Sequence, residues 1–98
     1  PYVMAWNEQA VPDKAAVIAR IFRGETAGHG LARLRLALGL DRSLDDYVPD
    51  DAGRSRIAQS AMKSGQVKMN PRLAGIEDVR MLLEAMRRPT GDAPPRVA

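Results

Sequence analysis

Apolar residues recur along this chain at helical spacing, in short segments separated by proline and glycine. Residues spaced by three, four and seven positions share one side of a helix, so each segment predicts a helix with one buried side. The predicted helices cover residues 2–9, 14–23, 26–38, 53–63 and 76–88. Their apolar stripes are Tyr2, Val3 and Trp6; Val17, Ile18, Ile21 and Phe22; Leu31, Leu34 and Leu38; Ile57, Ala58, Ala61 and Met62; and Ile76, Val79, Leu82, Leu83 and Met86. No segment alternates as a strand would, so the fold is predicted to be all-α, with about five short helices.

Residues at the segment boundaries agree with this prediction. Pro12 suits a first helical position, where no backbone N–H is needed. Thr26 suits a helix N-cap, and Gly39 suits the position just after a helix end. Gly24 and Gly65 are each expected to end a helix.

The acidic pairs Asp45/Asp46 and Asp50/Asp51 are expected to cap helices, because carboxylates accept hydrogen bonds from free amides there. Ser43, with an acid three positions later, predicts one short helical turn. Neither pair is expected to bind a cation.

Pro71 disfavours helix at the preceding residue, so 66–73 is predicted to be a loop. Pro89 is expected to end the last helix. The sequence therefore predicts a helical domain over residues 1–88 and a flexible tail over 89–98.

Composition narrows the functional classes. The 98 residues include no cysteine, which excludes disulfides and thiolate chemistry. No apolar run reaches the ~20 residues of a membrane span, and no signal peptide is present, so we expect a cytoplasmic protein. The net charge is +3, with basic residues spread among acidic ones, which favours a solvated surface over nucleic-acid binding. Because the chain starts at Pro1, we expect a fragment or a processed product.

Five motifs in order resemble one enzyme family. They are Pro1-Tyr2-Val3-Met4-Ala5-Trp6-Asn7; Val11-Pro12-Asp13-Lys14 leading to Ile18-Ala19-Arg20; Leu38-Gly39-Leu40 leading to Ser43-Leu44 and Asp46-Tyr47-Val48; Asn70-Pro71-Arg72 after an alanine-rich helix; and Glu77-Asp78-Val79 with Leu82-Leu83. This order resembles the C-terminal end of iron-containing (group III) alcohol dehydrogenases, over residues 1 to about 88. The implied fold is the C-terminal portion of a dehydroquinate synthase-like helical domain.

The resemblance implies a two-domain parent enzyme. Its N-terminal domain would bind NAD(P), and its helical domain would hold a divalent metal, iron or zinc, through one Asp and three His. The parent would transfer hydride between an alcohol or aldehyde and the nicotinamide. The family's metal ligands and glycine-rich nucleotide loop precede the Pro1–Asn7 helix, so no catalytic, metal or cofactor residue is assigned here. Alone, this chain is expected to be inactive.

The rest of the parent polypeptide is then the expected partner. A second copy of the chain, in a homo-oligomer, is a further candidate. Stripe residues on this chain should be exposed without it, namely Ile18, Phe22, Leu34, Ile57 and Leu83. By the same resemblance, Gln66, Val67, Lys68 and Met69 are candidates for the wall of the substrate cleft. The alternative for these four is a structural connection. For Asn70 and Arg72 a structural role is favoured, with the Asn70 amide bonding backbone groups and Arg72 pairing with an acid.

The single histidine and the serines do not indicate a metal site or a catalytic nucleophile. His29 is the only histidine, and one ligand does not make a metal site, so we expect a surface or helix-start residue. Ser43 and Ser64 have no nearby base that would make them nucleophiles.

A small basic helical module that binds nucleic acid or a partner protein is the alternative function. The helices over 31–40 and 53–63 would form a helix-turn-helix-like pair. The residues between them exceed the usual turn of about three or four residues, which weighs against this alternative.

Overall fold

The computed structural model describes residues 1–87, and every regular element in this part is helical. The elements are α1 (Tyr2–Asn7), α2 (Pro12–Ile21), α3 (Ala27–Ala37), the 3₁₀ turn η1 (Leu44–Asp46), α4 (Asp51–Met62), α5 (Gly65–Met69) and α6 (Ile76–Ala85). The prediction of an all-α fold is confirmed for these residues, with one more α-helix than expected. None of the helices within 1–87 has the length and apolar character needed to cross a membrane. The predicted tail over 89–98 and the stop at Pro89 lie outside the described residues.

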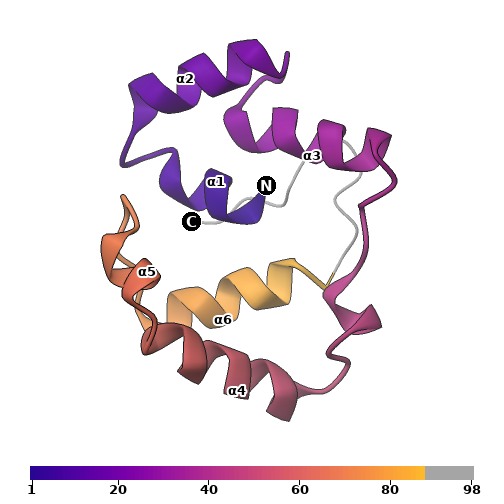
Figure 1. Ribbon diagram of the computed structural model, residues 1–98, viewed down its shortest axis with the longest axis vertical. Coiled ribbons are helices and arrows are strands. Elements are labelled where there is room, and N and C mark those ends of the chain that lie inside the picture. Colours follow the sequence, from indigo (N-terminus) through magenta and orange to yellow (C-terminus); the bar gives the residue numbers. More distant parts are fainter. Residues whose placement is uncertain (88–98) are drawn as a thin grey trace.

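The helices form two groups that meet at α1 (Figure 1). In the first group α3 packs against both α1 and α2, and in the second α4 packs against α6. Helix α1 also contacts α6, so it belongs to both groups. The six-residue α1 therefore joins the two halves of the fold.

Several helix boundaries follow the sequence signals. Pro12 is the first residue of α2. The Thr26 hydroxyl accepts a hydrogen bond from the His29 amide at 3.1 Å, and the Asp50 carboxylate accepts one from the Gly53 amide at 2.6 Å. The predicted turn after Ser43 is η1, with the Ser43 hydroxyl accepting from the Asp45 amide.

Helices α2 and α3 are both followed by a residue in the left-handed backbone conformation, which is Arg23 after α2 and Gly39 after α3. Gly39 follows α3 with φ +70°, and the Leu40 amide donates to the Arg35 carbonyl at 2.9 Å. After α2 the left-handed residue is Arg23, with φ 55°, and the Gly24 amide donates to the Ala19 carbonyl at 2.9 Å. Both are Schellman endings. The prediction that Gly24 itself ends this helix is therefore corrected by one position.

Gly24 is needed for another reason. A Cβ atom there would lie 2.3 Å from the backbone nitrogen of Gly30, and a Cβ atom on Gly30 would lie 2.8 Å from the Phe22 Cβ. The chain after α2 thus crosses the first turn of α3 at a distance that only glycine allows.

The main core lies where α1 meets α6. Tyr2, Trp6 and Leu82 form a buried cluster. Partly buried residues pack around it, namely Ala5, Ala74, Met81, Ala85 and Met86. Burial raises the pKa of the Tyr2 phenol, because the charged phenolate is poorly solvated there.

Elsewhere the buried residues are mostly alanine, which corrects the predicted stripe on α2. Ala15 and Ala19 are its buried residues, whereas Val17 and Ile21 are 46% and 67% exposed. A residue two positions along a helix is rotated by about 200°, so Val17 and Ile21 lie opposite the alanines. The close approach of α2 and α3 at Gly24 and Gly30 favours small side chains between them, which leaves the larger ones outside.

Three of the five residues that were expected to be exposed are exposed in the structure. Phe22, Leu34 and Ile57 are exposed as expected, and Ile18 is half-buried. Leu83 is buried, contrary to the expectation, because α6 packs against α4.

A second junction ties η1 to the end of α6. The Leu44 amide donates to the Met86 carbonyl at 2.8 Å, and the Ser43 hydroxyl donates to the Arg87 carbonyl. The Arg87 Nε lies 2.9 Å from Asp45 Oδ1, and this hydrogen bond raises the pKa of Arg87. Asp45 also faces the buried Arg54 at 3.6 Å.

We expect Gly24→Ala to lower the free energy of unfolding by about 2 kcal/mol, because the added methyl meets backbone that cannot move aside. Urea denaturation measures the change. Gly65→Ala is the matched control, because a Cβ there meets nothing within 4 Å; it should change the same quantity by less than about 1 kcal/mol. Equal effects of the two substitutions would contradict the close crossing.

Candidate functional site

The segment proposed to line a substrate cleft is a helix, which corrects the loop predicted for it. Helix α5 begins at Gly65, and the Ser64 hydroxyl accepts a hydrogen bond from the Gln66 amide at 3.2 Å. Gly65 therefore opens α5 and does not end α4, which stops at Met62. Pro71 has the expected effect on the residue before it: the Asn70 backbone is extended, and α5 ends at Met69. The missed signal was Ser64, which suits an N-cap.

An apolar pocket lies beside α5, with a volume of about 310 Å³. It is lined by residues of α1, α5, α6, the end of α4 and the segment before α6. They are Val3, Trp6, Ala61, Gln66, Val67, Asn70, Ala74, Val79, Leu82, Leu83 and Met86. Apolar side chains dominate, with the amides of Gln66 and Asn70 as the polar groups.

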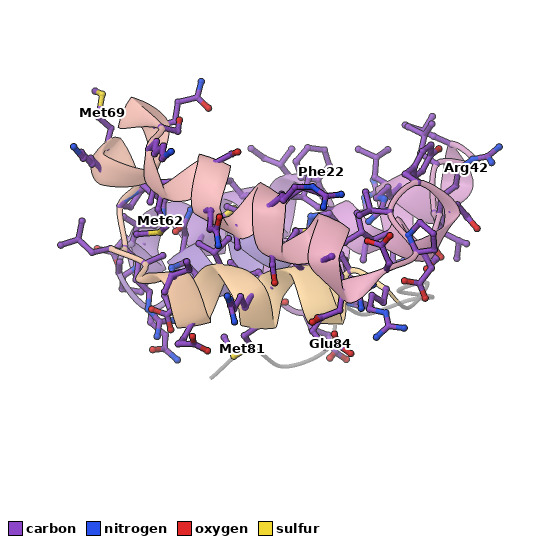
Figure 2. The ribbon with its side chains drawn as sticks, turned by 90° about the horizontal axis from the view of Figure 1, so that it is seen from below. Phe22, Arg42, Met62, Met69, Met81 and Glu84 are labelled. Atoms are coloured by element: carbon purple, nitrogen blue, oxygen red, sulfur yellow. The ribbon has the colours of Figure 1, made fainter. Side chains whose placement is uncertain are left out.

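The four candidate residues point to different sides of α5. Gln66 and Val67 line the pocket, whereas Lys68 and Met69 do not. The Met69 side chain is 87% exposed and projects from the outer end of the fold (Figure 2). The structure thus brings two of the candidates to the pocket and leaves two on the outer surface.

The end of α5 is attached to α1 by a pair of amide side chains. Asn7 Nδ2 donates to Asn70 Oδ1 at 3.0 Å, and Asn70 Nδ2 donates to Asn7 Oδ1 at 2.6 Å. Asn70 Nδ2 also donates to the Arg72 carbonyl at 2.7 Å. The predicted structural role of Asn70, bonding to backbone, is therefore observed together with a partner that the sequence did not indicate.

Arg72 completes this attachment. Its guanidinium lies over the Trp6 ring, 3.5 Å from the ring centroid, and donates to the Trp6 carbonyl at 3.0 Å. In return Trp6 Nε1 donates to the Arg72 carbonyl at 3.4 Å. Arg72 was expected to pair with an acid; it binds an aromatic face and a carbonyl instead. We call these four residues, Trp6, Asn7, Asn70 and Arg72, the α1–α5 clasp.

The clasp fixes one wall of the pocket. Helix α5 has only five residues, and a helix of that length is not stable alone. Contacts of Asn70 and Arg72 with α1 hold the chain on both sides of Pro71. They therefore determine where Gln66 and Val67 lie relative to Trp6.

Metal-binding side chains do not gather within residues 1–87. No three His, Asp or Glu side chains in this part come close enough together to hold a metal ion. His29 lies in the first turn of α3, and its Nδ1 accepts a hydrogen bond from the Glu25 amide at 3.0 Å. Asp50 caps α4 and Asp45 binds Arg87, so these two acids have structural partners. The residues of this described part therefore do not form a metal site by themselves, and no metal chemistry is assigned to them.

The helix-turn-helix-like arrangement is not formed. Helix α3 packs against α1 and α2, whereas α4 packs against α6. The two helices of the expected pair therefore belong to different halves of the fold (Figure 1).

Comparison with known proteins adds no assignment. No family model, no curated protein and no solved structure matches this chain.

We expect the clasp amides to be energetically coupled. Asn7→Ala and Asn70→Ala should each lower the free energy of unfolding by about 1–2 kcal/mol, because each leaves a partly buried amide without its partner. The double variant should lose less than the sum, with a coupling of about 0.5–1.5 kcal/mol in a urea double-mutant cycle. Pairing Asn7→Ala with Gln59→Ala, on the exposed side of α4, is the control and should be additive within about 0.5 kcal/mol. Additive Asn7 and Asn70 effects would contradict the reciprocal bonding.

Proposed function

We propose that this chain is the C-terminal part of the helical domain of an iron-containing alcohol dehydrogenase. The observation that carries the proposal is the α1–α5 clasp. Two motifs on which the family resemblance rests are separated by 63 residues, measured from Asn7 to Asn70. They nevertheless bond directly, side chain to side chain. The two motifs thus lie at one place in the fold, as a shared structural role for them would require.

The exposed apolar residues support the same proposal. Large side chains such as Val17, Ile21 and Leu38 lie on the surface, while alanines fill much of the interior. Burying such side chains stabilises a protein by about 1.5–3 kcal/mol each. A domain that normally packs against further polypeptide would show this arrangement.

In the parent enzyme, a bound NAD(P) would provide the hydride chemistry, and a divalent metal, iron or zinc, would provide polarisation of the alcohol or carbonyl oxygen. This chain contributes neither group's ligands. Its own part is to hold α5 in place, so that Gln66 and Val67 form a wall of the substrate cleft. The clasp and the packing of α6 on α1 keep that wall at a fixed position.

The encoding gene tests the proposal directly. We expect the reading frame upstream of Pro1 to encode a glycine-rich strand-turn-helix followed by an Asp and three His. The protein from the whole frame should reduce aldehydes with NADH or NADPH, and chelation should remove the activity. Adding back Fe²⁺ or Zn²⁺ should restore it. An upstream frame without these residues would refute the proposal.

In that whole protein, Gln66→Ala and Val67→Ala should raise the KM for an aldehyde about fivefold or more, because both residues line the pocket and contacts with the substrate are lost. kcat should change less than KM, since the chemical step uses other groups. Lys63→Ala is the control, being exposed just outside α5, and should leave both constants unchanged. If all three variants keep the original KM, α5 is a structural connection and not a cleft wall.

A further inference from the structure

Net positive charge is concentrated on the α2–α3 hairpin, residues 12–42. This segment has six basic and three acidic side chains, whereas residues 43–87 have seven of each. The salt bridges formed among the described residues involve Arg54 and Arg87 as cations, and none includes Arg20, Arg23 or Arg33. The hairpin therefore accounts for the basic character of this part of the chain.

Exposed apolar side chains are concentrated on the same hairpin. Seven of the twelve large exposed hydrophobic residues of the described chain belong to it. They are Val17, Ile21, Phe22, Leu34, Leu36, Leu38 and Leu40. An exposed apolar group of this kind next to an excess of cations is typical of an interaction surface.

Three of these residues form a row along α3. Phe22 lies against Gly30, since its Cβ is 2.8 Å from where a Gly30 Cβ would be. Leu34 follows Gly30 by one helical turn, and Leu38 follows by another, so both continue the row. Phe22, Leu34 and Leu38 are 37%, 40% and 61% exposed.

Arginines border the row. Arg33 Nη1 donates to the Arg23 carbonyl at 3.1 Å, which holds the Arg33 guanidinium beside the end of α2. Arg23 itself follows Phe22 and is exposed. We call Phe22, Leu34, Leu38, Arg23 and Arg33 the hairpin patch.

We propose that the hairpin patch is a docking surface for an acidic amphipathic helix. When an amphipathic helix binds to a protein surface, its apolar side chains contact apolar residues that are spaced about one helical turn apart. Cations at the border favour a partner with carboxylates beside its apolar stripe. Helix α6 of a second copy would not serve, because Leu82 and Leu83, which follow its acidic first turn with Glu77 and Asp78, are buried. The proposed function has the same side chains packing against the missing polypeptide, so the inference rests on it and names the chemistry of the segment that covers them.

The test uses a fluorescein-labelled peptide of about 18 residues, with leucines on one helical side and glutamates beside them. Fluorescence anisotropy should show saturable binding to this chain that weakens as NaCl is raised from about 0.05 to 0.5 M. A peptide with every glutamate replaced by lysine should not bind, and neither should a scrambled peptide of the same composition.

Substitutions test whether the peptide binds to the hairpin patch. Leu34→Glu should weaken binding at least roughly tenfold, as expected for a central anchor, and Arg33→Glu should weaken it and reduce the salt dependence. Leu73→Glu and Arg80→Glu, exposed outside the hairpin, are matched controls and should bind as the original chain does. Far-UV circular dichroism checks each fold, and Leu38→Glu, just after α3, replaces Leu34→Glu if that variant unfolds.

Four outcomes would overturn the proposal. They are no binding of the acidic peptide, equal binding of the lysine or scrambled peptide, equal weakening by the control variants, and binding to phosphatidylserine vesicles without peptide binding. None of these results bears on the dehydrogenase proposal, which the upstream gene and the activity of the whole protein decide separately.

Discussion

The stacking of the Arg72 guanidinium on the Trp6 ring is the interaction on which the rest of this fold depends. Trp6 lies in α1, and α1 is the helix shared by both halves of the fold. The same indole is covered by Leu82 and its neighbours on one side and bonded to the Arg72 backbone at its edge. A cation over an aromatic face stabilises by about 0.5–2 kcal/mol. Its larger effect here is positional, since it brings the segment after α5 onto α1 and so places α5 beside α6.

The two halves bury different kinds of surface. Around α1 and α6 the core contains large side chains, Tyr2, Trp6 and Leu82. Between α2 and α3 it contains alanine and glycine, which bring the backbones close but remove little apolar area from water. The larger side chains of α2 and α3 are therefore available on the outside. The core around α1 and α6 thus buries large side chains, whereas α2 and α3 leave most of theirs exposed.

Local signals in the sequence predicted local structure well. Pro12, Thr26, Gly39, Ser43 and Asp50 each act at a helix boundary as expected, because capping depends on residues close along the chain. Which side of α2 is buried could not be read from periodicity. Val17/Ile21 and Ala15/Ala19 have the same spacing, and the choice between them depends on the crossing at Gly24 and Gly30. For the site, two residues of the segment 66–69, Gln66 and Val67, line the pocket. Helix α5 was not predicted, since Ser64 was not considered as a cap. The partner of Arg72 is distant in sequence, so composition alone suggested an acid and the structure shows Trp6.

Trp6 is the only tryptophan of the chain. Its indole lies at the junction of the two halves, and its relative exposure is only 3%. The tryptophan emission of the protein therefore originates from this junction alone. Separation of the halves would bring water to the indole and move its emission to longer wavelength. The molecule thus contains its own optical reporter of whether the junction is closed, without any added dye.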